Sequence, residues 1–230
     1  MEHPIFFLTK LLESIGLGHF AHTYPHVTYT WLIMLLLIVF SLLAVKSIKM
    51  IPTGGQNFFE MVISGIENFQ VDTMGEKGRV FFPILATLGL FIFLSNALGL
   101  IPGFYSPTAS INTTLACALI VFVMTHIIGI KTHGFKYIKQ FLGPIWWLAP
   151  LMFPIEIISH LSRVLSLTLR LFGNIFGEDL VLGILLLLAG KFLAPAVVMM
   201  FLALFTSFIQ AFVFVLLSMI YFSTALEEAH

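Results

Sequence analysis

Long apolar runs alternate with short polar stretches along this chain of 230 residues. A run of about 20 apolar residues, wound as an α-helix, is long enough to cross the ~30 Å hydrocarbon core of a bilayer. Three runs of roughly this length are separated by stretches rich in charged residues, proline or glycine. They predict three near-perpendicular membrane spans, at 27–50, 80–101 and 111–130.

A different pattern separates the first two spans. Between residues 56 and 71, apolar side chains recur at helical spacing and lie opposite Glu60 and Glu67. This periodicity is typical of an amphipathic helix at a membrane surface or against a partner. We expect that helix on the cytoplasmic side. Residues 1–26 mix histidines with Gly and Pro, and we expect them to form a short segment on the outer face.

The last two runs are longer than a perpendicular span requires. Residues 154–190 contain strong helix formers and no proline after the first position, and a helix of that length extends roughly 50 Å. Residues 192–226 form a second overlong run, without a charged residue. We therefore predict an all-α polytopic membrane protein with a single membrane domain, in which these two helices form a strongly tilted hairpin.

Polar residues of the 154–190 helix gather on one of its sides. At about 100° per residue, the polar residues share an arc of roughly 120°. They are Glu156, Ser159, His160, Arg163, Ser166, Arg170, Asn174 and Glu178. The other side of the helix consists of Leu, Ile, Val and Phe.

Arg170 is the most costly residue of this polar stripe. An arginine inside an apolar bundle costs at least ~2.5–3.5 kcal/mol, and its guanidinium stays protonated, so burial does not neutralise it. Arg170 lies between Leu169 and Leu171, far from either end of the helix. We expect it to face an aqueous cavity or an anionic partner. The alternative is that it joins two helices through a carboxylate.

The amino-acid composition excludes several other classes of protein. Hydrophobic residues make up 59% of the chain and charged residues 10%, with a mean hydropathy of +1.05. Soluble domains contain about 25% charged residues, so a soluble fold is excluded. The single cysteine, Cys117, excludes an intrachain disulfide. Neither Cys/His clusters at metal spacing nor a Gly-rich phosphate loop occur, and we expect no metal, cofactor or nucleic-acid partner.

Lysines indicate how the chain is oriented. They cluster after the first and third spans, at Lys46, Lys49, Lys131, Lys136 and Lys139. Because cytoplasmic loops carry an excess of Lys and Arg, these ends are expected on the cytoplasmic side. The amino terminus is then outside and the carboxyl terminus cytoplasmic.

Titratable residues lie at both ends of the polar stripe. Glu156 and His160 are one turn apart at one end, and Glu178 and Asp179 lie beyond Arg170 at the other. Carboxylates and imidazoles inside a membrane are typical of proton relays. A fixed positive charge between them repels protons and divides one path into two. The pattern therefore predicts two half-paths joined by a separate proton carrier.

Four segments together resemble one known family. SRVLSLTLRLFGN and FIQAFVFVLLSMIY, with NALGLIP and PTASINTTLA in the middle spans, resemble subunit a of bacterial F-type ATP synthases. The likeness extends from Trp31 to Glu228. It implies a non-catalytic subunit of the bacterial inner membrane. The implied partners are a ring of c subunits, the b-subunit peripheral stalk, the remaining ATP synthase subunits and membrane lipid.

The resemblance also assigns roles to individual residues. It implies that Arg170 faces the acidic residue of the rotating c-ring, between two aqueous half-channels that load and unload that acid. The other matching positions are Asn174 and Gln210 near the arginine, Glu156, Ser159 and Ser166 on the cytoplasmic side, and Ser110 and Asn112 near the opposite opening.

Two departures from the family pattern leave alternatives open. A gap-free alignment selects Asp179 as the acid after the arginine, whereas the helical arc selects Glu178. The last helix of the family often carries a histidine or acid seven residues before the glutamine, and here that position is Ala203. Coupling to protons is favoured over sodium, because no additional carboxylate–hydroxyl cage is evident.

Two other functional classes compete with this interpretation. A secondary transporter would bind a small solute at the polar stripe, but the paired discontinuous helices of such proteins are not evident. An intramembrane enzyme would require a nucleophile–base pair or metal ligands, for which His126 and His160 alone give thin support.

Overall fold

The computed structural model describes residues 7–13, 16, 18–46, 55–101, 103–134, 137, 147, 149–189 and 194–227. Regular structure in these ranges is entirely helical. The α-helices are α1 (Phe7–Glu13), α2 (Gly18–Thr23), α3 (Pro25–Lys46), α4 (Gly55–Met74), α5 (Phe82–Gly99), α6 (Ile111–His133), α8 (Ala149–Ala189) and α9 (Ala194–Leu226), and the 3₁₀ turns are η1 (Glu76–Phe81) and η2 (Pro107–Ala109).

Five of the described helical segments are long and apolar enough to cross a membrane. They are Pro25–Leu43, Glu76–Gly99, Ile111–His133, Pro150–Leu185 and Val197–Leu226. The prediction of an all-α polytopic membrane protein is therefore confirmed. The first span ends earlier than expected, at Lys46, and residues 47–50 of the predicted span lie outside the described residues.

The start of α8 differs from the expected start at residue 154. The helix begins at Ala149 and includes both Pro150 and Pro154, so it extends over 41 residues. Pro150 lies in the first turn, where the missing N–H has no intrahelical partner to lose. Pro154 forgoes one backbone hydrogen bond, which a helix of this length tolerates. The predicted start at residue 154 is therefore later than the observed start at Ala149.

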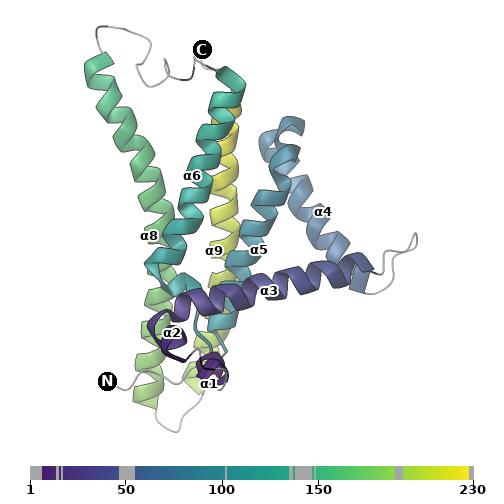
Figure 1. Cartoon of the computed structure of the whole chain (residues 1–230), viewed down its shortest axis with the longest axis vertical. Helices are drawn as coiled ribbons and strands as arrows, with labels where there is room; N and C mark the ends of the chain where they lie inside the picture. Colours follow the sequence, from purple (N-terminus) through teal and green to yellow (C-terminus); the bar gives the residue numbers. More distant parts are fainter. Residues whose placement is uncertain are drawn as a thin grey trace.

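The core forms where α5, α6, α8 and α9 pack together (Figure 1). Its buried side chains come from all four helices and include Leu85, Ile92, Val121, Leu171, Phe214 and Met219. Gly89 of α5 faces α9, and a Cβ there would lie 2.8 Å from Cγ2 of Val215. A small residue at a helix interface allows such close approach in membrane proteins. The four helices thus hold the polar stripe of α8 in a fixed position.

Helix α3 runs across the direction of α6, α8 and α9 in Figure 1. Its amino-terminal half is held by Tyr29, which is fully buried and whose hydroxyl oxygen accepts a hydrogen bond from the Leu8 backbone N–H at 3.3 Å. Because α3 is transverse to the long helices, these elements are not all parallel to one membrane normal. The spans predicted at 27–50 and 111–130 therefore do not both stand near-perpendicular to the membrane, because α3 also runs across α6. The tilt of α8 and α9 stays a prediction.

Helix α4 occupies the stretch for which the sequence predicts an amphipathic helix over 56–71. Its carboxyl-terminal half packs against α9, where the ring centroids of Phe69 and Phe212 are 5.2 Å apart. The Gln70 side-chain amide donates to the Gly78 carbonyl at 2.6 Å, which holds the turn that follows. The position of α4 at the cytoplasmic surface stays a prediction.

Candidate functional site

The polar stripe of α8 is continuous, because the helix is unbroken from Glu156 to Glu178. Arg170 near its middle is exposed, and its Nη2 donates to the Ser166 hydroxyl at 3.4 Å. Within the described ranges, no carboxylate lies at ion-pair distance from Arg170. The described residues thus give no support to the alternative that Arg170 joins two helices through an internal carboxylate. The guanidinium faces outward instead.

One turn beyond Arg170, a side-chain hydrogen bond joins the two long helices. Nδ2 of Asn174 on α8 donates to Oε1 of Gln210 on α9 at 2.6 Å. The Gln210 side chain is 3% exposed, whereas Asn174 is exposed. The structure therefore brings together two residues, 36 positions apart in sequence, that were both expected near the arginine.

Both candidate acids lie at the far end of the stripe. Glu178 is half-buried, and its Oε2 is buried with no hydrogen-bond partner among the described residues. Asp179 is exposed, and it lies near Tyr105 in the segment that follows α5. Burial raises the pKa of Tyr105, and the Asp179 carboxylate raises it further. The geometry thus does not select one acid; it places both at the same end of α8.

A buried polar cluster that the sequence did not predict lies between α5 and η2. The Ser106 hydroxyl donates to the Ser95 carbonyl at 3.1 Å, and the Thr108 hydroxyl donates to Oδ1 of Asn96 at 2.5 Å. Among the described residues, the Ser95 hydroxyl and the Asn96 Nδ2 have no partner. Buried polar groups in this condition are normally satisfied by ordered water. An asparagine inside an apolar span was the sequence signal for this cluster.

Ser110 and Asn112 follow this cluster at the start of α6. Ser110 is half-buried and precedes the first residue of the helix, and Asn112 is exposed. Helix α8 packs against η2, so this segment lies beside the helix that carries Glu178. The polar residues expected near one opening are therefore contributed by two adjoining elements.

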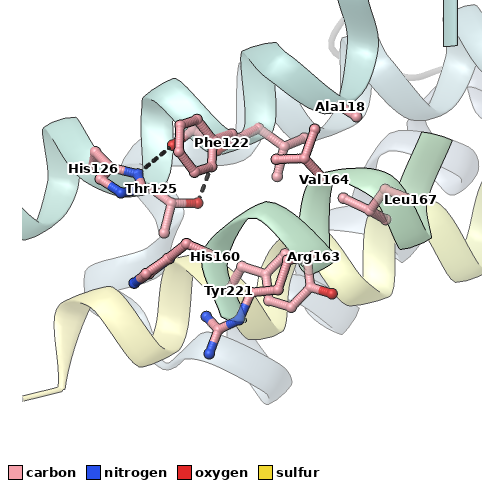
Figure 2. A pocket seen from close by; sticks show the side chains of 10 residues that line it. Ala118, Phe122, Thr125, His126, His160, Arg163, Val164, Leu167 and Tyr221 are labelled. Atoms are coloured by element: carbon pink, nitrogen blue, oxygen red, sulfur yellow. Dashed lines mark hydrogen bonds between the residues drawn. The ribbon is translucent and has the colours of Figure 1, made fainter. Parts of the chain in front are cut away.

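Titratable side chains gather at the other end of the stripe (Figure 2). His160 Nε2 lies 3.4 Å from Oε1 of Glu156. The rings of His160 and His126, both labelled in Figure 2, have centroids 5.0 Å apart. The Arg163 guanidinium carbon lies 5.3 Å from the ring centroid of Tyr221, which is cation–π geometry. Ser159, half-buried on the same helix, follows Glu156 by three residues. No sequence pattern predicted His126 in this group.

Comparison with known proteins identifies the family of the chain. Residues 27–223 match the family described as ATP synthase A chain. The chain belongs to this family. It is 61% identical to ATP synthase subunit a of Syntrophobacter fumaroxidans, 60% to that of Desulfosudis oleivorans and 58% to that of Geobacter sulfurreducens. Each of these alignments covers the whole of both chains.

The match to the ATP synthase A chain family includes all of α8, most of α9 and the polar cluster near η2.

Ala203, whose side chain is apolar, stands where the family often carries a histidine or an acid. Ala203 is 2% exposed on α9, and its methyl group offers no hydrogen bond to an acid on α8. Four residues later, the buried Ser207 hydroxyl has no partner among the described residues. Any polar partner for the acids must therefore come from another position.

Proposed function

We propose that this chain is the proton-translocating stator subunit of an F-type ATP synthase. In this proposal it provides two aqueous half-channels, and a carboxylate of the c-subunit ring carries protons between them. The observation that supports this most is Arg170, an exposed guanidinium in the middle of a membrane helix without a described carboxylate partner. A permanent charge in that position requires water or an external anion.

The outer half-channel in this proposal ends at Glu178 and Asp179. The described residues offer no partner to the buried Glu178 Oε2, the Ser95 hydroxyl or the Asn96 Nδ2. These groups support the proposal because they then require water. Ser110 and Asn112 contribute polar groups beside them. Protons would pass from this water to the carboxylates of Glu178 or Asp179, and from there to the c-ring acid.

The inner half-channel lies at the other end of the stripe, with Glu156, Ser159, His160 and Ser166. The Glu156 carboxylate and the His160 imidazole can accept and release protons, and the two serines supply hydroxyl groups that orient water between them. Ser166 contacts Arg170, so the inner half-channel reaches the arginine along one face of α8. Asn174 and Gln210 would adjoin the arginine on its other side.

Arg170 would separate the two half-channels electrostatically. At about 4 Å and an effective dielectric constant of about 20, opposite unit charges attract by about 4 kcal/mol, which lowers the pKa of a carboxyl group by about 3. A c-subunit acid that approaches Arg170 would therefore release its proton before passing. The same charge repels protons that would cross directly between the half-channels.

The remaining surface fits a subunit surrounded by lipid and other chains. Leu165 and Leu169 flank the stripe and are 52% and 55% exposed, so apolar partners must cover them. We assign these partners to the c-ring and lipid, and the peripheral b subunit and remaining ATP synthase subunits to other faces. We place the chain in a bacterial inner membrane, with its amino terminus outside and its carboxyl terminus in the cytoplasm.

Reconstitution into sealed vesicles tests this function. The chain is inserted with and without the c-ring of the same complex, and proton flux is measured under an imposed membrane potential. Flux that requires both components supports the proposal. Uptake of a solute by the chain alone would instead indicate a secondary transporter, and proton flux by the chain alone would refute a carrier on the c-ring.

A further inference from the structure

A small pocket lies between α6, α8 and α9 at the Glu156 end of the polar stripe (Figure 2). Helix α6 contributes Thr125 and His126, α8 contributes His160 and Arg163, and α9 contributes Tyr221. The two imidazole rings are tilted by 58° with centroids 5.0 Å apart. His160 was expected in a proton path, but His126 comes from another helix and has no part in the half-channels proposed so far.

Hydrogen bonding fixes which nitrogen of His126 can take up a proton. Its Nδ1 lies 2.9 Å from the Phe122 carbonyl oxygen, four residues earlier on α6. A carbonyl oxygen only accepts hydrogen bonds, so Nδ1 carries the hydrogen in the neutral ring and Nε2 carries the lone pair. His126 therefore acts as a base at Nε2 and returns the proton from the same atom. It can store a proton but does not pass one through the ring.

The groups around the pair have opposing charges. Oε1 of Glu156 lies 3.4 Å from Nε2 of His160, and the Arg163 side chain lines the same pocket. Tyr137 lies against His126 with ring centroids 6.0 Å apart, and burial raises the pKa of its hydroxyl, so it stays neutral. The Thr125 hydroxyl donates to the Val121 carbonyl at 2.8 Å. The two imidazoles and the Glu156 carboxylate thus supply the nitrogen and oxygen atoms that can accept a proton here.

We propose that His126 and His160 form a proton-collecting pair that supplies the inner half-channel. This inference rests on the proposed function and adds to it a store of protons on α6. Together with Glu156, the pair offers three sites at which a proton from the cytoplasm can bind before it moves toward Arg170. His126 adjoins the path rather than forming an obligatory link in it.

The scarcity of free protons is the physical reason for such a pair. At about pH 8 the free proton concentration is about 10⁻⁸ M, and a diffusion-limited capture constant of about 10¹⁰ M⁻¹s⁻¹ then supplies only about 10² protons per second to one site. A rotary motor that pumps protons outward draws every one of them from this side. Additional bases that exchange protons with buffer molecules raise the rate at which the channel fills.

The test compares His126→Asn with the wild-type complex. Asparagine keeps a side-chain N–H that can donate to the Phe122 carbonyl but does not titrate. Inverted membrane vesicles expose the cytoplasmic side to the medium, and ATP-driven proton uptake is measured from about pH 6 to about pH 8 in weak buffer. We expect the variant to match wild type at the acidic end. Near pH 8 it should fall about three- to tenfold, less than the loss of a sole general base.

Chemical rescue separates proton collection from a packing role. Raising the imidazole concentration of the medium should restore the rate of His126→Asn, because a mobile base then delivers protons directly. The matched control is His133→Gln, also on α6, where Nε2 lies 3.2 Å from the Ala225 carbonyl and outside the pocket. We expect this control to show neither the loss nor the rescue.

Three outcomes would overturn the inference while leaving the proposed function intact. One is a His126→Asn complex that equals wild type at every pH and buffer strength. Another is a loss that is independent of pH and is not rescued, which indicates packing. The third is rescue only by imidazole loaded inside the vesicles, which places the pocket on the other side. Failure of the proposed function is distinguishable, because the wild-type vesicles would then show no c-ring-dependent proton flux.

Discussion

The hydrogen bond between Asn174 and Gln210 gives a prediction that can be worked from the structure. Asn174→Leu removes the donor of the 2.6 Å bond between α8 and α9. The Gln210 side chain, 3% exposed, is then left with a buried carbonyl oxygen that has lost its partner. Leaving a buried polar group unsatisfied costs about 1–3 kcal/mol, more than the bond itself contributes on balance.

The double replacement separates the cost of the unsatisfied Gln210 oxygen from the net contribution of the hydrogen bond. When Gln210→Leu is added, the buried amide is removed as well, so the double variant should lose less stability than the sum of the single variants. Side-chain hydrogen bonds within membranes have coupling energies that average about 0.6 kcal/mol and reach about 1.7 kcal/mol. We expect a coupling in the upper half of that range, because the bond is short and Gln210 is buried.

The assay is unfolding of the purified chain in mixed micelles, with helix content followed as denaturing detergent is added. Thr206→Val is the matched control. Its hydroxyl donates to the Leu202 carbonyl within α9, so the substitution removes no contact between helices. Single variants whose losses simply add, with no measurable coupling, would refute the conclusion that this bond fixes α9 against α8.

Two further predictions concern the acids of the polar stripe and the packing of α6. Replacing Glu178 and Asp179 together with their amides should slow ATP-driven pumping while the complex stays assembled, because amides form hydrogen bonds but do not relay protons; unchanged pumping would remove both residues from the path. Gly129→Ala should destabilise the chain by about 1–3 kcal/mol, because the added methyl overlaps the Tyr137 ring. Gly65→Ala, with nothing near its Cβ, is the control for thermal unfolding. Equal midpoints for the two alanine variants would contradict the packing of Tyr137.

The fold class could be predicted because the length and periodicity of apolar runs are local properties. The predicted bounds of the long apolar runs lie at or near the observed bounds of the helices. The repeat of 100° per residue also predicted that Arg170 and Asn174 lie on the same side of the helix. The predicted start of the helix at residue 154 was wrong, because prolines such as Pro150 and Pro154 usually mark helix breaks in a sequence. In space they lie close enough to the amino terminus that few backbone bonds are lost.

Contacts between distant helices could not be predicted from those local signals. The approach of His126 to His160 depends on how α6 packs against α8, and neither residue carries a pattern that identifies the other. The same holds for the Thr108–Asn96 hydrogen bond, which forms only when η2 folds back onto α5. Residue type suggested that these groups needed partners, but tertiary packing determined which partners they found.

The most direct measurement concerns Arg170, an exposed residue that we propose separates the two half-channels. Membranes with Arg170→Ala, in which assembly of the complex is verified, are assayed for ATP synthesis and for passive proton permeability. We predict that synthesis is abolished and that protons leak through the membrane sector, because the barrier between half-channels is lost. Arg170→Lys should also be impaired, since lysine lacks the planar fork and can lose its proton when desolvated. Coupled ATP synthesis retained in the alanine variant, without a leak, would contradict the role assigned to Arg170.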